Sequence, residues 1–351
     1  MYRLVRCGLA VAIAALWGGS LQGQAKHTPT LEESLNLKTI GGARISPDGR
    51  FIAYRVRETD WKENAYVRQI WLVNVASGAS FQLTRGKKSS DAPEWSPDGR
   101  WLAFIGEREA NAISPVGATD KAEKKEGKDE KKEAEGKPAA RQIWVISPDG
   151  GEAWQLTQQE TDIGAFHWSK DGKQIAFTAA SPEGKNEKDR KEKYSDYEVF
   201  EEDFRQNQLW VADASEAEEK QAPIKARQIT RDASLNVNGF AWSPEGKRIA
   251  FAATHNPMLA FAGEEDIYLA ELAKDNGVQK IIALDGPDGD PIFSPDGKQI
   301  AFGTALAQPY FYYANRHIAL VDVERVLAHP ATKPEDVQDL TAQFDEDPWI
   351  S

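Results

Sequence analysis

Few residues of this 351-residue sequence have the type and spacing that enzyme chemistry requires. The clearest candidates are two adjacent carboxylates, Glu201 and Glu202, which end a charged segment. Two carboxylates beside a water-poor cavity can hold an ammonium group through charge-assisted hydrogen bonds. A solvent-facing acidic turn is the alternative interpretation of the same pair. The sequence therefore offers one candidate for substrate binding and leaves its role open.

The residues needed for nucleophilic, metal or cofactor chemistry are missing. No Gly-x-Ser-x-Gly segment occurs, so the sequence has no nucleophile elbow, and it has neither a Walker loop nor a dinucleotide fingerprint. The acidic segment 285–290 lacks the ligand spacing of a calcium loop and is interpreted as a turn. The histidines lie in different parts of the chain without zinc-site spacing, at His27, His167, His255, His317 and His329. We therefore expect no catalytic residue, no metal and no cofactor in this chain.

Composition excludes several classes of protein. Hydrophobic residues make up 40% and charged residues 28%, which is enough apolar material for a folded core. The formal net charge of −12 gives no electrostatic basis for binding nucleic acid or anionic lipid. A single cysteine excludes both a disulfide framework and a cysteine-based zinc site.

The first 25 residues have the pattern of a secretory signal peptide. Arg3 and Arg6 precede a short apolar run, and Gly23 and Ala25 occupy the two small-residue positions that a signal peptidase reads. The apolar run is about a dozen residues long, whereas a membrane-spanning helix needs about 20. We predict cleavage near Ala25, a periplasmic or secreted location, and no membrane attachment afterwards. Cys7 would be lost with the signal peptide.

The dominant pattern in the rest of the sequence is a turn that occurs five times. Its serines are separated by 50, 73, 74 and 51 residues, and an Ile/Leu-Ala-Phe or similar strand follows each turn. Pro suits the second position, Asp the third and Gly the fourth, and the Ser hydroxyl can cap the turn. Because this serine recurs in every turn, we interpret it as structural and not as a nucleophile. The structural turn residues are Ser46, Asp48, Gly49, Ser96, Asp98, Gly99, Asp171, Gly172, Gly246, Ser294, Asp296 and Gly297.

Each repeat contains two further landmarks. An outer strand of the type Gln-Ile-Trp-Val is followed by a closing strand that ends in Gln-Leu-Thr or a similar triplet. Each unit therefore supplies about four short strands. A lone four-stranded sheet cannot bury both of its faces, but radial stacking of such sheets does so, which predicts a β-propeller. A β-sandwich would not explain five copies of one turn with the same downstream landmarks.

We therefore predict an all-β propeller of about five blades and the start of a sixth, open or incomplete, over residues 26–351. The predicted units are 31–84, 85–157, 158–230, 231–284 and 285–341, with 342–351 as the start of a sixth. A disordered charged insertion is predicted at 116–140, and a second insertion at 182–206, in which 194–204 is compatible with a short helix. For the aromatic loop 309–313 we favour packing within its own hairpin over packing on a neighbouring domain.

The repeat resembles those of two groups of proteins. Trp-Ser-Pro-Asp-Gly-Lys/Arg-x-Ile/Leu-Ala-Phe, followed by Leu/Ile-Trp-Val and Gln-Leu-Thr, is similar to the blades of TolB-type periplasmic propellers. It is equally similar to the N-terminal propeller of the prolyl oligopeptidase family of serine peptidases, in its dipeptidyl-peptidase and acylaminoacyl-peptidase branches. The resemblance covers residues 31–351. Two details favour the peptidases: residues 31–37 lead directly into the first unit, and 201–210 is similar to bacterial members of that family.

The resemblance implies a function for a longer protein. It implies that this chain is a non-catalytic propeller that limits entry to short peptides, and that a C-terminal α/β-hydrolase domain missing here carries the catalytic Ser, Asp and His. In the dipeptidyl-peptidase branch a Glu pair in a propeller insertion binds the substrate's free amino group. Glu201 and Glu202 precede the outer strand, which departs from the family's setting. The alternative is a TolB-like interaction scaffold without enzymatic activity.

Overall fold

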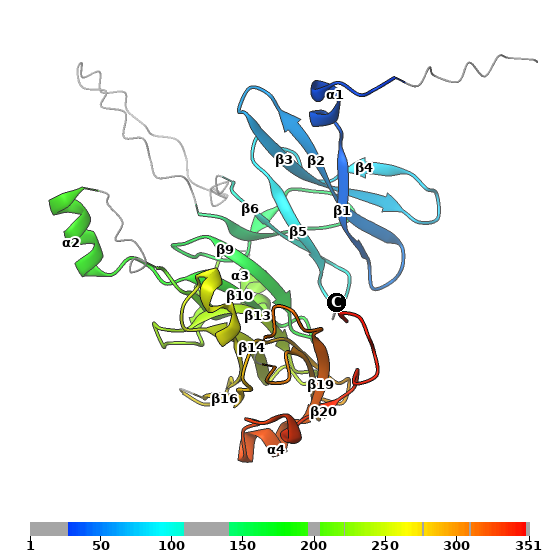
Figure 1. Ribbon diagram of the computed structural model, residues 1–351. Helices are drawn as coiled ribbons and strands as arrows, with labels where there is room; N and C mark the ends of the chain where they lie inside the picture. Colours follow the sequence, from blue (N-terminus) through cyan, green and yellow to red (C-terminus); the bar gives the residue numbers. More distant parts are fainter. Residues whose placement is uncertain are drawn as a thin grey trace, which may run out of the picture.

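Five four-stranded antiparallel sheets follow one another along the chain. In Figure 1 they form an arc from the blue first sheet at the top to the orange and red fifth sheet at the bottom. This computed structural model describes residues 27–108, 140–195, 204–220, 222–275, 277–308 and 310–348. In every sheet, four strands pair in the order in which they occur in the sequence. The predicted fold class, an all-β propeller of about five four-stranded blades, is confirmed.

The strands of the first sheet are β1 (Thr39–Ile45), β2 (Phe51–Asp60), β3 (Ala65–Asn74) and β4 (Ser80–Gln82). The second sheet holds β5 (Ser90–Trp95), β6 (Leu102–Gly106), β7 (Gln142–Ile146) and β8 (Trp154–Gln155). The third holds β9 (Ile163–Trp168), β10 (Gln174–Ala180), β11 (Asn207–Asp213) and β12 (Arg227–Gln228). The fourth holds β13 (Asn236–Trp242), β14 (Arg248–Thr254), β15 (Asp266–Glu271) and β16 (Val278–Ile282). The fifth holds β17 (Asp288–Phe293), β18 (Gln299–Thr304), β19 (His317–Asp322) and β20 (Gln338–Asp339).

Short helices occur before and between the strands. They are α1 (Leu31–Leu35), α2 (Lys185–Tyr194), α3 (Ala214–Lys220), α4 (Val323–Ala328), η1 (Leu259–Glu264) and η2 (Pro334–Asp336). Within the described ranges, none of the helices is both long and apolar enough to cross a membrane.

The repeated turns join the first two strands of each sheet with one geometry. In the four turns that contain Asp, the Ser hydroxyl donates to the Asp carboxylate over 2.6–2.7 Å. In all five, the same hydroxyl accepts the backbone N–H five residues later over 2.9–3.0 Å. The turn glycines have φ between +70° and +73°, a left-handed conformation that disfavours a side chain. These turns are therefore structural elements with their polar groups satisfied.

A buried Gln–Thr pair holds the outer part of each of the first three sheets. The Thr hydroxyl that follows the closing strand donates to a Gln side chain of the third strand, in the pairs Thr84–Gln69, Thr157–Gln142 and Thr230–Gln208. The Gln side-chain N–H groups in turn donate to carbonyls of the loop leading to the next sheet. The Gln and Thr landmarks therefore tie each sheet to the connection that follows it.

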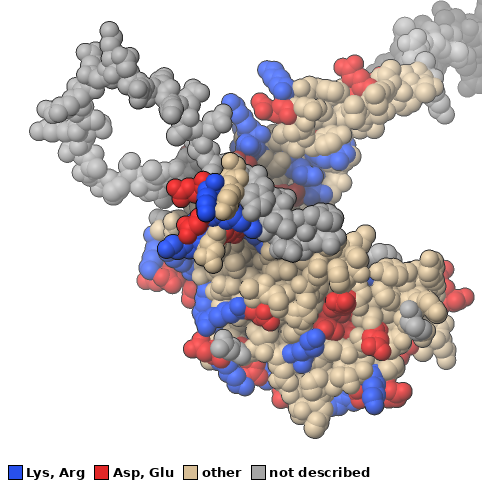
Figure 2. Space-filling model, turned by 60° about the vertical axis from the view of Figure 1, so that its left-hand side comes forward, with Lys and Arg blue, Asp and Glu red and all other residues tan. Residues whose placement is uncertain are grey.

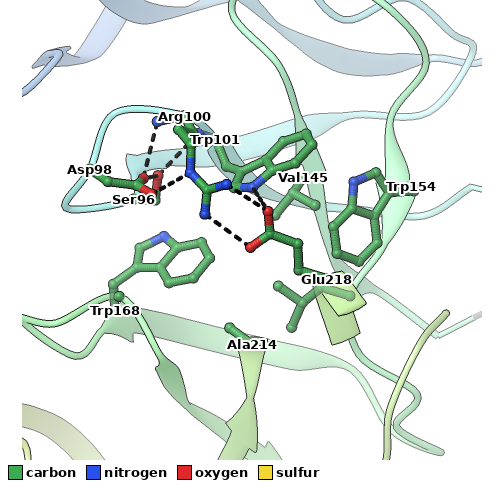
Figure 3. Close-up of a pocket in the computed structure, with 11 residues that line it drawn as sticks. Ser96, Asp98, Arg100, Trp101, Val145, Trp154, Trp168, Ala214 and Glu218 are labelled. Carbon is green, nitrogen blue, oxygen red and sulfur yellow. Dashed lines mark hydrogen bonds and ion pairs between the residues drawn. The ribbon is translucent and has the colours of Figure 1, made fainter. Parts of the chain in front are cut away.

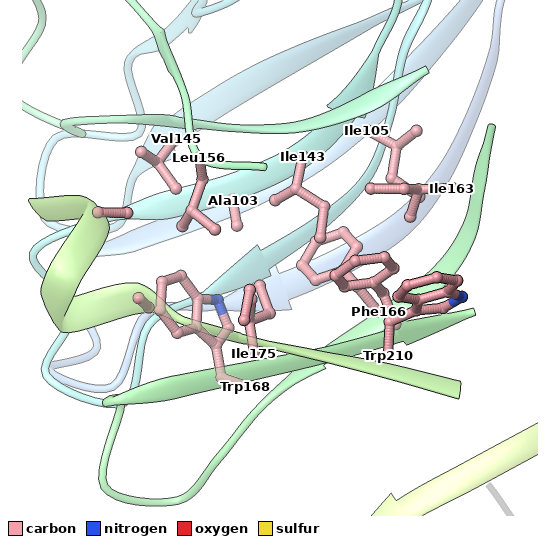
Figure 4. Packing of buried hydrophobic residues seen from close by; sticks show 14 of the residues in the cluster. Ala103, Ile105, Ile143, Val145, Leu156, Ile163, Phe166, Trp168, Ile175 and Trp210 are labelled. Atoms are coloured by element: carbon pink, nitrogen blue, oxygen red, sulfur yellow. The ribbon is translucent and has the colours of Figure 1, made fainter. Parts of the chain in front are cut away.

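The hydrophobic core lies between successive sheets. One face of the first sheet, including Ala53 and Leu72, packs against Trp95, Leu102 and Phe104 of the second. A similar cluster joins the second and third sheets (Figure 4). The Phe that ends each Ile/Leu-Ala-Phe segment is fully buried in the second to fifth sheets, at Phe104, Phe177, Phe251 and Phe302. The aliphatic and aromatic repeat positions therefore provide the sheet-to-sheet packing that stabilises the fold.

Each of the two outermost sheets exposes apolar side chains at positions that are buried elsewhere. Ile45 of the first sheet is 68% exposed, whereas Trp95 and Trp168 at the same repeat position are at most 9% exposed. Leu340 after the fifth sheet is 51% exposed, whereas the corresponding Leu156 is 1% exposed. These exposed positions fit the predicted open or incomplete propeller.

One local prediction differs from the structure, and a second falls mostly outside the described residues. The charged part of the second insertion forms α2, supported by the Glu187–Lys191 pair one turn apart and by basic residues in its last turn. Residues 196–203, the centre of the segment compatible with a helix, lie outside the described residues, as do 109–139 in the charged insertion. The predicted turn 285–290 is wrong in its second half, because β17 begins at Asp288, which pairs with Thr304.

Candidate binding face

The two ends of the sheets carry different kinds of connection. Because the strands are antiparallel and in sequence order, the repeated turns lie at one end of every sheet, and the connections from second to third strand lie at the other. We call these the turn end and the loop end. The second-to-third connections are 61–64, 107–141, 181–206, 255–265 and 305–316. Both predicted insertions and α2, at the left of Figure 1, therefore belong to the loop end.

Exposed aromatic side chains gather in these connections. Tyr310, Tyr312 and Tyr313 are 75%, 66% and 93% exposed. The prediction that this loop packs within its own hairpin is wrong for Tyr310 and Tyr313, whereas the Tyr312 ring centroid lies 4.1 Å from that of Phe311 in the same loop. Phe311 anchors the loop, since it lies where a Cβ on Gly263 would clash with it. The other exposed aromatics in or beside these connections are Trp61, Tyr66, Tyr194 and Phe204. A cluster of exposed aromatic rings is typical of a surface that contacts a ligand or another domain.

A group of acids lies where the fourth and fifth sheets meet at the loop end. The Glu265 carboxylate accepts from the Asn238 side chain over 2.7 Å, and its backbone carbonyl accepts from Asp288 N–H over 2.8 Å. Asp288 is fully buried; one carboxylate oxygen accepts from Leu284 N–H, and the other has no hydrogen-bond partner among the described residues. Burial raises the pKa of Asp288 to about 7, and the charges of Asp266 and Glu265 add to the effect.

Sequence reasoning missed Asp288 because three acids among Gly and Pro look like a turn. A signal was nevertheless present in the repeat. The position six residues before the turn serine is Ser90, Ile163 and Val237 in the second to fourth sheets, and all three are buried. An Asp aligned with buried positions indicates a buried carboxyl group.

A hollow of about 600 Å³ lies beside α2 at the loop end. It is lined by Glu160, Asp162, Pro182, Lys188, Arg205 and Asn207, among others. Arg205 donates to Glu187 over 3.0 Å and also pairs with Glu183, which fixes the chain just after the second insertion. The predicted substrate-binding residues Glu201 and Glu202 lie outside the described residues, so their role stays a prediction.

A smaller cavity lies at the turn end, between the second and third sheets (Figure 3). Its volume of about 20 Å³ has room for roughly one water molecule. The rings of Trp101 and Trp154 pack edge to face with their centroids 5.8 Å apart. Arg100 forms ion pairs with both Asp98 and Glu218. This cavity is a small gap in the packing between two sheets and not a ligand site.

The predicted structural turn residues all lie at the turn end, in the hydrogen-bonded geometry given above. Three of the histidines contact carboxylates: His27 Nε2 lies 3.1 Å from Glu33, His167 Nδ1 lies 2.9 Å from Glu94, and His317 Nδ1 lies 3.1 Å from Asp339. Among the residues that the structure describes, no three His, Cys, Asp or Glu side chains are grouped as metal ligands.

Comparison with known sequences identifies peptidases as relatives. No protein-family model matches the chain. It is 26% identical to an uncharacterized peptidase, YuxL, of Bacillus subtilis over 81% of this chain. It is 25% identical to dipeptidyl-peptidase 5 of Porphyromonas endodontalis over 78% of this chain. These matches cover only 32% and 38% of the two relatives, so the chain spans about a third of their length.

Solved structures show the same fold. An acylaminoacyl peptidase of Pyrococcus horikoshii superposes with a TM-score of 0.57 at 16% identity, covering 90% of this chain and 41% of that one. The β-propeller domain of the Trilobed protease of Pyrococcus furiosus superposes with a TM-score of 0.51 at 16% identity, covering 88% and 72%. In sequence the chain is therefore a homologue of bacterial peptidases, and in fold it is a β-propeller like those of peptidases, as its repeats indicated.

Proposed function

We propose that this chain is the non-catalytic propeller of an exported serine peptidase of the prolyl oligopeptidase family, and that its loop end faces the active site. The observation that carries the proposal is that the chain matches peptidases over about four fifths of its own length and only about a third of theirs. Its sequence also lacks Gly-x-Ser-x-Gly. The nucleophile, with its Asp and His, would then belong to an α/β-hydrolase domain outside these residues.

The loop end has the chemistry that short peptides require. Exposed tyrosines such as Tyr313 offer flat apolar surfaces with polar tips, and the hollow beside α2 is lined by both acidic and basic side chains. Within the proposal, Glu201 and Glu202 bind the peptide's free amino group, since the segment that carries them ends beside this hollow. The propeller would limit entry to short peptides. Cleavage of the signal peptide near Ala25 would release the protein into the periplasm or the medium.

A fluorophosphonate probe, which labels activated serines, tests the assignment of catalysis. We expect the full-length protein to be labelled and to hydrolyse dipeptidyl substrates, while the 351-residue chain is neither labelled nor active. Labelling of the 351-residue chain would contradict the proposal. A full-length protein that is not labelled and that forms stable complexes with other proteins would favour the TolB-like scaffold.

Substitution of the Glu pair tests substrate binding. In the full-length protein, Glu201→Gln and Glu202→Gln should raise the KM for peptides with a free amino group and leave N-acetylated peptides unaffected. Glu216→Gln, which removes an exposed carboxylate paired with Lys220 in α3, is the matched control. Equal effects on both kinds of peptide would argue against amino-group recognition.

A further inference from the structure

Four arginines line the joint between the first and second sheets at the loop end. Along β2, Arg55 and Arg57 lie on the same face as Ala53, the face that packs on the second sheet. Arg68 of β3 pairs directly with Arg57 and shares that face. Arg108 follows β6 and its guanidinium lies over Phe104, which points at the first sheet. Figure 2 shows Lys and Arg side chains (blue) on the upper part of the molecule, where the first sheet lies, as well as over the rest of the visible surface.

Among the residues that the structure describes, a single carboxylate pairs with these four guanidinium groups. Asp91 accepts from Arg55 over 2.7 Å and lies 3.6 Å from Arg68. Within the described residues, Arg57 and Arg108 form no ion pair. The guanidinium carbon of Arg57 lies 4.4 Å from the centroid of the Tyr66 ring. The buried Nε of Arg57 has no hydrogen-bond partner in the described part of the chain.

Arg108 is held by groups that carry no charge. It donates to the Ser90 hydroxyl over 3.1 Å, and its guanidinium carbon lies 4.9 Å from the Phe104 ring and 6.0 Å from the Trp144 ring. Burial alone lowers the pKa of Arg108. At the turn end the opposite holds, since the Asp98 carboxylate raises the pKa of Arg100.

An uncompensated, partly buried cation is costly, because water is removed from it without a counter-charge in return. This chain has 12 more acids than bases, and two arginines at the turn end have carboxylate partners: Arg100 pairs with Asp98 and Glu218, and Arg248 pairs with Glu324. Arg57 and Arg108 are partly buried without such a partner among the described residues, and an anionic ligand would supply the missing counter-charge.

We propose that this joint is a carboxylate-binding site in which Arg57 and Arg108 bind the ligand. The Ser90 hydroxyl supports Arg108, and the Tyr66 and Phe104 rings hold the two planar guanidinium groups in place. A planar guanidinium matches the two oxygens of a carboxylate. The ligand is a short peptide, bound through its C-terminal carboxylate or an acidic side chain. That identity rests on the proposed function, whereas the anion site does not. Long polyanions are disfavoured because the net charge of −12 repels them.

Calorimetric titration of the purified protein with three related peptides tests the site. The probes are N-acetyl-Ala-Ala with a free carboxylate, the same peptide as its C-terminal amide, and N-acetyl-Glu-Ala amide. We expect at least one carboxylate-bearing peptide to bind about tenfold or more tightly than the neutral amide. Preference for the first assigns the site to the C-terminus, and preference for the third assigns it to an acidic side chain. Equal binding of all three would overturn the proposal.

Two arginine variants show whether the binding belongs to this joint. Arg57→Gln and Arg108→Gln should each weaken the favoured peptide about tenfold, whereas Arg248→Gln, the loss of a paired arginine at the turn end, should not. Because Arg108 has no counter-ion in the described part of the chain, the variant Arg108→Gln should melt at the same temperature as the wild type or higher. A marked fall in its melting temperature would show that Arg108 is structural and would contradict the proposal.

The result is separable from the peptidase proposal, because binding is measured without catalysis. If the full-length protein shows no peptidase activity but prefers the carboxylate peptides, the result supports the anion site and contradicts the proposed function. If it is an active peptidase without this preference, the result contradicts the anion site alone.

Discussion

At the turn end, all five sheets repeat one set of hydrogen bonds, with a Ser hydroxyl that caps the turn and a left-handed Gly that closes it. At the loop end, the five connections differ in length, charge and exposure, and they carry most of the exposed aromatic side chains. The Ser and Asp side chains of the repeated turns find partners within the same turn, although Trp168 Nε1 beside the third turn is buried without a partner among the described residues. At the loop end, Arg57, Arg108 and Asp288 are partly or fully buried with atoms or charges that nothing in the described residues satisfies.

The difference separates structural from functional residues within a repeat. A polar group that occurs in every copy of a repeat is satisfied by that repeat, so it stabilises the fold. A polar group that occurs in one copy and is buried without a partner costs free energy. Such costs are tolerated at sites that bind ligands or change with conditions. The loop end is therefore where binding is expected.

The largest expected effect on stability is at Asp288. Its carboxyl pKa is about 7 in the folded state against an ordinary 3.8, so the folded state keeps a proton that the unfolded state loses. The free energy of unfolding should therefore fall by about 2–4 kcal/mol as the pH rises from about 4 to about 7. Asp288→Asn should remove this fall and be more stable than the wild type at pH 8.

Chemical denaturation at several pH values measures the effect, with the exposed Asp290→Asn as control. The turn end should titrate with the opposite sign, because the hydrogen bond from Ser46 lowers the pKa of Asp48 and its contribution is lost only below about pH 4. A variant Asp288→Asn with the wild-type pH dependence would contradict the assignment of a buried, proton-holding Asp288.

The next effect concerns a turn serine. Ser169→Ala removes the donor to Asp171 and the acceptor of Gln174 N–H from a residue that is 1% exposed. We expect a loss of about 2 kcal/mol in the free energy of unfolding. Ser234→Ala is the matched change at an exposed site near the loop end and should cost less than about 0.5 kcal/mol. Similar losses for both variants would break the contrast between the two ends.

A turn glycine should show a slightly smaller effect. Gly172 has φ +71°, and a Cβ there would lie 3.4 Å from Pro97 of the preceding turn. Gly172→Ala should therefore cost about 1–2 kcal/mol of stability. Gly86, near the loop end, has no positive φ and an open surrounding, so Gly86→Ala should change stability by less than about 0.5 kcal/mol. Denaturant midpoints of the two variants measure the difference.

The smallest effect on stability is expected at Tyr313. The side chain is 93% exposed, so Tyr313→Ser should leave the melting temperature within a degree or so of the wild type. In the full-length protein the same variant should raise the KM for peptide substrates if the aromatic loop contacts them. An unchanged KM would show that this loop does not contact the peptide, and it would not bear on the other connections of the loop end.

The repeat predicted the fold because its turn residues and its alternating apolar positions act locally. The serine of each turn and the Phe that follows it could be placed from the sequence, since each needs only its own sheet and the adjacent one. The burial of Asp288 was indicated by its alignment with the buried positions Ser90, Ile163 and Val237, but its acidic, Gly- and Pro-containing surroundings pointed to a turn. The missing counter-ions of Arg57 and Arg108 could not be inferred, because they depend on which faces distant strands bring together. The exposure of Tyr313 was missed for the same reason: an aromatic loop packs only where a neighbouring element leaves room for it.

The binding face itself is tested most directly by photo-cross-linking. A short peptide with a free amino group, a free carboxylate and a photoreactive side chain is irradiated with the full-length protein, and the labelled residues are mapped by mass spectrometry. If peptides bind at the loop end, labels should lie in residues 55–68, 255–265 and 310–316 and compete with unlabelled peptide. Labels concentrated in the turns at 46–50, 96–100 and 169–173 would contradict the assignment of the loop end as the binding face.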